Sequence, residues 1–226
     1  MKLDYTIVYS QRKKLTVTVE RNRSVVVRAP EGTDPEKIRE VVESRKPWIY
    51  EKTRHLQKYN GQPHPPGKEL VNGESLLYLG RNYQIEIVDS EEQDIQFSQR
   101  FIVPKALYSQ RREVFKQWYM AKAKEKLLPR VKLHAKNLGV DYNRVKIVDI
   151  KYRWGSCTLK DNLNFNWRLI KAPMFVIDYV IVHELAHLFE ANHTPRFWNI
   201  VRSQSAKMDR AKQWLKEHGE ILEIEI

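Results

Sequence analysis

Three histidines and a glutamate near the C-terminal end of the chain have the types and spacing of a metal-dependent hydrolase site. His183 and His187 lie four positions apart, and His193 follows six positions later. Positions i and i+4 of a helix share one face, so the first two imidazoles can close on a single ion. A catalytic zinc site has three protein ligands and one open position. The pattern therefore predicts one zinc ion bound by His183, His187 and His193.

Glu184, which directly follows the first histidine, has the position of a general base. In an H-E-x-x-H helix this carboxylate lies beside the ion, where it can take a proton from a metal-activated water. A purely structural zinc site needs no base. Glu184 therefore favours a catalytic centre over a structural one.

Glu190 is a second acidic residue near the histidines. The spacing from His183 to His193 is similar to that of metzincin peptidases, but those have glycine where Glu190 stands. Two helical turns separate Glu190 from His183, so its carboxylate is expected on the ligands' face. There it could approach the metal or fix a ligand imidazole through its other N–H. A solvated glutamate is the alternative.

The segments around the histidines have the composition of buried helices. A helix is expected from 173 to 191, with Pro173 in its first turn. The part before His183 is apolar on nearly all sides, which indicates a buried helix. A second helix is expected from Thr194 as N-cap, with Pro195 at its first position, to about His218. Gly219 would close it.

Two short strands are expected upstream of this helix. The alternation of apolar and polar residues over 145–150 has the period of a half-buried strand, and residues 163–168 read as a second strand. The second strand, near 162–167, could bind an extended peptide along its edge.

Four strings occur in an order and at spacings that resemble the YgjP-like metallopeptidase family, which is related to SprT and minigluzincin-type zinc proteases. They are RWGSC, LNFNWRLIKAP, IDYVIVHELAHL and NHTPRFW. The N-terminal SVVVRAPEGTDPEKIREVVESRKPWI and LYLGRNYQIEI also resemble the front half of that family. The resemblance implies a zinc metallopeptidase acting on peptides or proteins. It also implies zinc at the three histidines and Glu184 as the general base.

A peptidase also needs a donor for the negative charge of its tetrahedral intermediate. Arg153, Tyr152 and Tyr179 are candidates, and Tyr179 lies one turn before His183 on the same helix face. For each of them, a packed tyrosine or an ion-paired arginine is the alternative.

The pattern of elements predicts an α+β fold in two parts. Residues 1–107 read as a β-rich region with one helix, and residues 108–226 as a zincin-like helical domain with a small antiparallel sheet. The helix of the first part is expected to begin at Asp34-Pro35 and to have Ile38, Val41, Val42, Ile49 and Trp48 on its apolar face. Strands are expected at 6–9, 15–19, 24–27, 76–79, 83–88 and 95–103, and a loop at 58–68.

A long basic helix is expected from 109 to 138, ended by Gly139 and kinked or interrupted at Pro129. Between 111 and 136 it has nine lysines and arginines against two glutamates. Such a surface can contact phosphates, although simple solvation also explains it. Two alternatives therefore stay open: a metal-dependent nucleotide phosphohydrolase (a pyrophosphatase), and a nucleic-acid-associated protease of the SprT type.

The composition of the chain bears on its cellular location. The chain has 226 residues, a formal net charge of +12 and one cysteine, Cys157, which permits no internal disulfide and is expected to be a buried free thiol. No apolar run reaches the roughly 18 residues that a membrane-spanning helix needs. A cytoplasmic protein with no membrane partner is expected.

Overall fold

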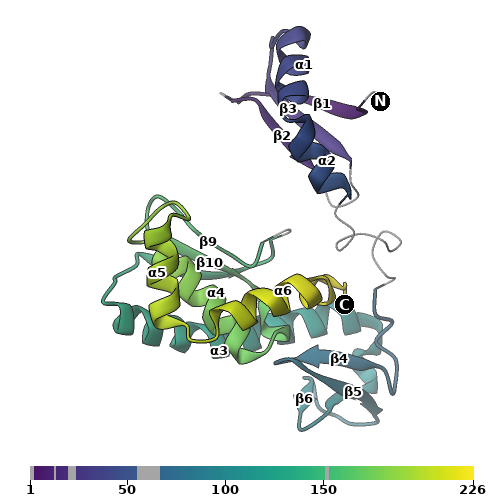
Figure 1. Cartoon of the computed structure of the whole chain (residues 1–226). Coiled ribbons are helices and arrows are strands. Elements are labelled where there is room, and N and C mark those ends of the chain that lie inside the picture. Colours follow the sequence, from purple (N-terminus) through teal and green to yellow (C-terminus); the bar gives the residue numbers. More distant parts are fainter. Residues whose placement is uncertain (1–2, 13, 20–23, 55–66, 151–152) are drawn as a thin grey trace. The chain divides into compact units, whose positions relative to one another are not determined.

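The computed structural model describes residues 3–12, 14–19, 24–54, 67–150 and 153–226. The chain divides into two compact units, Met1–Pro65 and Pro66–Ile226, and each has its own hydrophobic core (Figure 1). This division differs from the boundary expected at 107/108, because the strands between 75 and 104 share the core of the second unit. The loop expected at 58–68 lies almost entirely outside the described residues.

The first unit is a three-stranded sheet with two helices on one of its faces. Its elements are β1 (Tyr5–Ser10), β2 (Thr16–Val19), β3 (Val25–Pro30), α1 (Pro35–Ser44) and α2 (Lys46–Arg54). β3 is central, parallel to β1 and antiparallel to β2. Alternate residues of β3 are buried, and they meet the apolar residues of the helices in one core. The strands expected from alternation in this region are confirmed.

Two helices replace the single helix that was expected in the first unit. α1 ends at Ser44, and Pro47 stands in the first turn of α2, where its missing N–H costs nothing. In one continuous helix Pro47 could not donate to the carbonyl of Glu43, and its ring would clash with that carbonyl, so the chain breaks at Arg45 (φ −98°, ψ 3°). Ile38, Val42 and Ile49 are buried as expected, but Trp48 is 39% exposed, so its assignment to the apolar face is wrong.

The second unit begins with a four-stranded sheet of order β4-β5-β7-β6. Its strands are β4 (Ser75–Tyr78), β5 (Arg81–Val88), β6 (Gln96–Phe97) and β7 (Phe101–Pro104). β5 and β7 are parallel, whereas the outer pairs are antiparallel. Tyr78, Phe97 and Phe101 pack around Trp118 of the next helix, with ring centroids 5.0–5.7 Å from the tryptophan. This aromatic cluster joins the sheet to the rest of the unit.

A short 3-10 helix, η1 (Lys105–Gln110), leads into α3 (Arg111–Leu138), which is the longest element of the chain. Residues at intervals of four form its buried stripe: Phe115, Tyr119, Ala123, Leu127, Val131 and Ala135. Gly139 ends the helix with a left-handed backbone (φ 69°), as expected. Pro129 does not interrupt it. The proline lies on the exposed side, where water can satisfy the carbonyl that the ring leaves without a donor.

A second small sheet follows, made of β8 (Arg144–Val148), β9 (Gly155–Cys157) and β10 (Asn162–Asn166). β10 is the central strand, parallel to β8 and antiparallel to β9. The sheet is therefore mixed rather than antiparallel as expected. The 3-10 helix η2 (Trp167–Lys171) connects β10 to the first C-terminal helix.

Three helices complete the unit: α4 (Met174–Ala186), α5 (Pro195–Gln204) and α6 (Met208–Glu223). α4 is buried nearly all round and packs against α3, α5, α6 and β9. It ends five residues earlier than expected. The single helix expected from 195 to 218 is two helices, because the extended backbone of Ser205 (φ −128°, ψ 85°) breaks it. Gly219, expected as a terminator, lies within α6.

The α+β class is confirmed. No helix in the described part of the chain is long and apolar enough to cross a membrane.

The β4–β5 turn packs directly on the junction between η2 and α4. Leu79 and Gly80 form a two-residue turn in which both φ angles are positive (49° and 79°). Their N–H groups donate to the carbonyls of Ile170 (3.0 Å) and Lys171 (2.8 Å). A Cβ added to Gly80 would lie 2.6 Å from Cγ of Pro173, the residue before α4. The turn therefore fixes the start of α4 through a contact that only glycine allows.

Gly80→Ala is expected to destabilise the second unit by about 2–4 kcal/mol, because strain at positive φ adds to a clash with Pro173. Gly73→Ala is the matched control: its φ is also positive (82°), but nothing lies within 4 Å of the added Cβ. It should cost only the backbone strain, about 1–2 kcal/mol. Urea unfolding of both variants measures the difference, and equal losses would contradict the steric argument.

Candidate metal centre

The three histidines converge. The ring nitrogens that could each hold an ion lie within 4.8 Å of one another, and Nε2 of His193 is 3.0 Å from Nε2 of His183. Around a tetrahedral zinc with bonds of about 2.0–2.1 Å, ligand nitrogens stand roughly 3.3 Å apart. Small side-chain adjustments would thus be enough for the three imidazoles to surround one ion.

Different elements hold the three rings. His183 lies within α4, and His187 is the residue that ends it, with backbone angles (φ −66°, ψ −15°) that are still helical. The two rings therefore keep the one-turn spacing expected of them. His193 lies in the segment between α4 and α5, next to Thr194, whose hydroxyl caps α5 by accepting from the N–H of Phe197 (3.3 Å).

The Nδ1 atoms of His183 and His187 have different surroundings. Nδ1 of His187 is 3.1 Å from the carbonyl oxygen of Glu190, and a proton on Nδ1 would make this a hydrogen bond and leave Nε2 free as a ligand. Nδ1 of His183 is buried without a hydrogen-bond partner among the described residues. Only its Nε2, which faces His193, can reach an ion.

An aromatic pair on α5 packs around the rings. The Phe197 ring lies 5.0 Å, 4.5 Å and 4.7 Å from the ring centroids of His183, His187 and His193. Trp198 stacks on His193 at an interplanar angle of 24°, and Nζ of Lys212 stands 4.4 Å from the tryptophan centroid. Sequence reasoning assigned no role to Phe197 and Trp198. Their position at the start of an amphipathic helix, shortly after His193, was the available signal.

The surroundings favour the neutral form of two of the imidazoles. Burial, followed by the neighbouring histidines and Lys212, lowers the pKa of His183 to about 3. Burial and His187 also lower the pKa of His193. A metal ligand must be the neutral imidazole, so this environment suits binding. Three nitrogen donors of this kind are the set that zinc takes in catalytic sites.

Glu184 is a buried carboxyl beside the histidines, with 7% of its surface exposed. Burial raises its pKa to about 7, although the backbone N–H of Cys157 and the charge of Arg153 act in the opposite direction. A Cβ added to Gly155 would lie 2.7–2.9 Å from Cγ, Oε1 and Cδ of Glu184. β9 and the carboxyl group of Glu184 therefore press together so closely that no side chain fits between them.

β8 and β9 are the edge strands of the small sheet, and β10 lies between them. The N–H of Thr158 donates to the carbonyl of Asn162, and the carbonyl of Trp154 accepts from the N–H of Asn166. The backbone groups of even-numbered residues in and beside β9 therefore point toward β10. The backbone groups of Gly155 and Cys157 then lie on the opposite edge. The expectation that the strand near 162–167 offers its edge to a peptide is wrong, because neighbours on both sides pair with β10.

The three residues expected to stabilise the tetrahedral intermediate differ in how they lie relative to the site. Tyr179 packs 5.9 Å from the His183 ring, and burial, Glu184 and Asp209 raise its pKa to about 12, so its hydroxyl stays a donor. The side chain of Arg153 is exposed, and its charge acts on Glu184. Tyr152 lies outside the described residues.

Of the two remaining residues, Glu190 differs from its expected role, whereas Cys157 is the free thiol that was expected. Glu190 lies beyond the end of α4, so it no longer shares the ligands' helix face, and it reaches His187 through its backbone carbonyl rather than its carboxylate. Cys157 is a half-buried free thiol. Burial, Glu184 and Asp161 raise its pKa to about 11, so the thiolate needed for metal binding is disfavoured.

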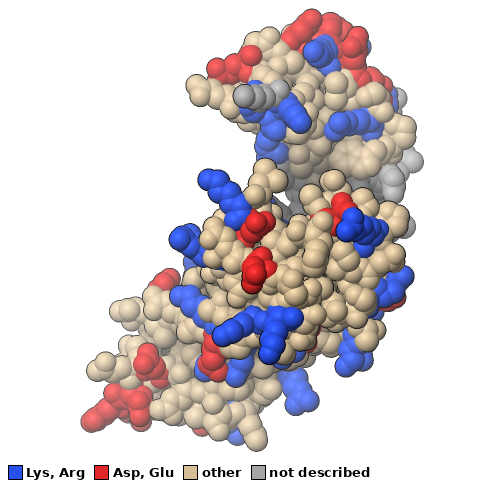
Figure 2. Space-filling view, turned by 90° about the vertical axis from the view of Figure 1, so that its left-hand side faces the viewer, with Lys and Arg blue, Asp and Glu red and all other residues tan. Residues whose placement is uncertain are grey.

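Four of the nine basic residues between 111 and 136 form ion pairs with acidic residues. Lys116 pairs with Asp149 at 2.8 Å, and Lys122 and Lys126 share Glu125 at 2.7 and 2.8 Å. Arg130 pairs with Asp178, which also accepts from His134. On the face in Figure 2, basic side chains are interrupted by acidic and uncharged ones. A phosphate group would have to compete with carboxylates for these four side chains.

A comparison with known protein families finds a match over most of the chain. A family model described as YgjP-like, metallopeptidase domain, matches residues 13–218. Two similar solved structures are the metallopeptidase zymogens of Pyrococcus abyssi abylysin and Methanocaldococcus jannaschii jannalysin. The first is 22% identical (TM-score 0.35) over 38% of this chain and 86% of its own. The second is 21% identical (TM-score 0.34) over 39% and 91%. No curated protein matches.

Gly155→Ala is expected to move the Glu184 carboxyl and to destabilise the second unit by about 1–3 kcal/mol, because the methyl group overlaps three atoms of that side chain. A crystal structure of the variant should show Glu184 in a changed rotamer.

The control is Gly219→Ala, inside α6, where the added Cβ meets only Trp154 at an ordinary 3.8 Å. This change should stabilise the protein by about 0.5–1 kcal/mol, because alanine favours helix. If Gly155→Ala left both stability and the position of Glu184 unchanged, the close approach of β9 to Glu184 would be wrong.

Proposed function

The chain belongs to the YgjP-like metallopeptidase family, and we propose that it is a zinc peptidase in which His183, His187 and His193 hold one zinc ion and Glu184 is the general base. The observation that carries the proposal is the convergence of three imidazoles beside a buried carboxyl group. A structural zinc site would need a fourth protein ligand and no base.

Zinc in such a site supplies Lewis acidity, which polarises a carbonyl and brings the pKa of water toward neutrality. The protein supplies the remaining functions. Glu184 takes the proton of the attacking water and passes it to the leaving amine. A carboxyl group with a pKa of about 7 suits both directions of transfer, because it holds and releases a proton near neutral pH.

Negative charge that develops on the scissile carbonyl oxygen needs a nearby donor. Tyr179 offers a protonated hydroxyl next to His183, and Arg153 offers a permanent positive charge near Glu184. We assign this stabilisation to one or both of these side chains. Glu190 supports the site by orienting His187 through its carbonyl.

We place the substrate along β9. At the outer edge of this strand, the backbone groups of Gly155 and the carbonyl of Cys157 can pair with an extended peptide. The N–H of Cys157 already bonds to Glu184, which places the base at the same edge. A peptide bound there would lie next to both the base and the histidines.

The two alternatives that the basic helix left open gain no support from the described residues. Lys116, Lys122, Lys126 and Arg130 are engaged in ion pairs with acidic residues of the same protein. A nucleotide phosphohydrolase or a nucleic-acid-associated protease would need such cations to be available for phosphates.

The purified protein is expected to bind one zinc ion per chain, as measured by elemental analysis and by titration of the metal-free protein against a chromophoric chelator. Replacing His193 by alanine removes one of three ligands, so affinity should fall about 100-fold or more. His218→Ala is the control, because His218 packs against Trp214 on α6 and is outside the cluster. Unchanged affinity in the His193 variant would contradict the assignment of the third ligand.

Glu184→Gln is expected to keep the fold and the zinc but to lower peptide turnover about 100-fold or more, since an amide has nearly the same shape and cannot accept the proton. Cleavage of an unfolded protein, followed by mass spectrometry with and without a chelator, measures the loss. A zinc-loaded variant with near-normal turnover would show that another group is the base.

A further inference from the structure

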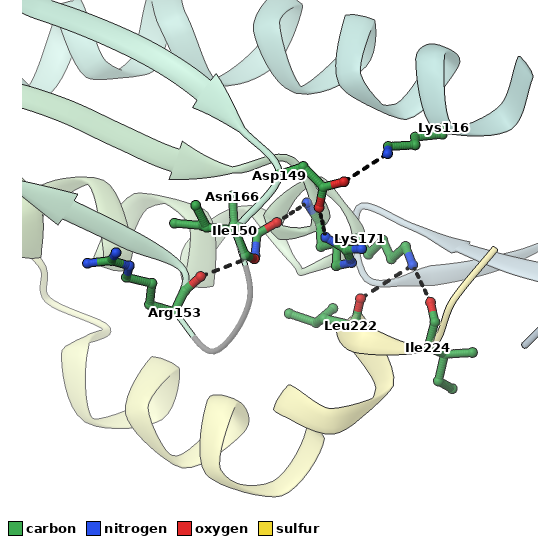
Figure 3. A network of polar contacts seen from close by, with 9 residues as sticks. Lys116, Asp149, Ile150, Arg153, Asn166, Lys171, Leu222 and Ile224 are labelled. Atoms are coloured by element: carbon green, nitrogen blue, oxygen red, sulfur yellow. Dashed lines mark hydrogen bonds and ion pairs between the residues drawn. The ribbon is translucent and has the colours of Figure 1, made fainter. Parts of the chain in front are cut away.

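Asn166, at the end of β10, uses its whole side chain for buried hydrogen bonds. Its Nδ2 donates to the carbonyls of Ile150 (2.7 Å) and Arg153 (3.1 Å), as Figure 3 shows. Its Oδ1 accepts from the N–H of Arg168 (3.0 Å) and so caps η2. The residue is 2% exposed. A carboxamide is the side chain that offers two donors and an acceptor in one plane.

The two carbonyls stand on either side of residues 151 and 152, in the segment that leads from β8 into β9. A second attachment lies just before them, where Asp149 accepts from Lys116 of α3 and from Arg168. The backbone N–H of Asn166 also donates to the carbonyl of Trp154 (2.9 Å). Asn166 thus holds three backbone oxygens of the chain that enters β9.

This attachment bears on the active site because β9 carries out two tasks there. Gly155, two residues after Arg153, approaches Glu184 more closely than any side chain would allow, and Cys157 donates its N–H to the same carboxyl. β9 has a partner strand on one side only. On its other side no strand among the described residues holds β9 in place, so its position there depends on how the residues just before it are held.

We propose that Asn166 is a positioning residue of the peptidase site: its amide fixes the segment before β9, so that the strand edge stands correctly against both Glu184 and an extended peptide. The kinetic part of this inference rests on the proposed function. The structural part, that Asn166 holds β9, does not.

Asn166→Asp tests the donor role of the side chain separately from its acceptor role. The carboxylate keeps the shape and the acceptor for Arg168, but it turns an oxygen toward the carbonyls of Ile150 and Arg153, where a donor is needed. Amide hydrogen exchange within 153–157 should become about tenfold faster or more, measured without substrate. The KM for an eight-residue peptide should rise about tenfold, with zinc affinity within about twofold of the parent.

Lys171→Met is the matched control. Lys171 leaves the same 3-10 helix and is also buried, but it donates to Leu222 (3.3 Å) and Ile224 (3.1 Å) at the end of α6 (Figure 3). Its loss should lower thermal stability and accelerate exchange near the end of α6. Exchange in 153–157 and the KM for peptides should stay as in the parent.

Unchanged exchange in 153–157 of Asn166→Asp would overturn the proposal, and so would the same kinetic change in the lysine variant at equal loss of stability. If Asn166→Asp fails to fold, Asn166→Ser replaces it, because serine keeps a capping oxygen. Faster exchange confined to 153–157 supports the proposal in that variant as well. If the parent protein cleaved no peptide, the proposed function would fail while the exchange result still decided the role of Asn166.

Discussion

The contact between Glu184 and β9 is the constraint on which the site depends. A carboxyl group that is almost fully buried normally carries a large desolvation cost, and here it has one backbone donor and a nearby cation. The carboxyl can be this close to the strand only because residue 155 has no side chain. This one approach keeps the base beside the histidines, raises its pKa toward neutrality, and brings it to the strand edge where we propose that substrate binds.

The three histidines are positioned by two different physical means. His183 and His187 inherit their geometry from α4, which is packed on several sides and therefore rigid. His193 has no such helix beneath it. Its ring is instead held between Phe197 and Trp198, and the hydroxyl of Thr194 fixes the start of the helix that carries both aromatic residues. The third ring thus depends on α5 as much as on the chain segment that contains it.

The short helix η2 connects the two halves of the site. It joins β10, which supports β9, to α4, which carries the first two histidines. Around it, the β4–β5 turn donates to its carbonyls, Asp149 binds Arg168, and Lys171 reaches the end of α6. Burial lowers the pKa of Lys171 to about 7, so this lysine is held by carbonyl groups without a full counter-charge. The contacts of the β4–β5 turn and of Asp149 therefore set the relation between the strand and α4, whereas Lys171 joins η2 to the end of α6.

The sequence by itself determined the features that depend on local spacing. These are the α+β class, most strands, the stripe of α3 at intervals of four, and the one-turn separation of His183 and His187. Only the tertiary structure decided what depends on residues distant in the chain. The order β8-β10-β9, which makes β9 an edge strand and β10 the central one, follows from pairing across turns and cannot be read from alternation. The contacts of Gly155 with Glu184 and of Asn166 with Ile150 join residues far apart in the chain, and no local pattern predicts them. Helix ends were misplaced for the same reason: the break at Ser205 and the early end of α4 reflect packing rather than propensity.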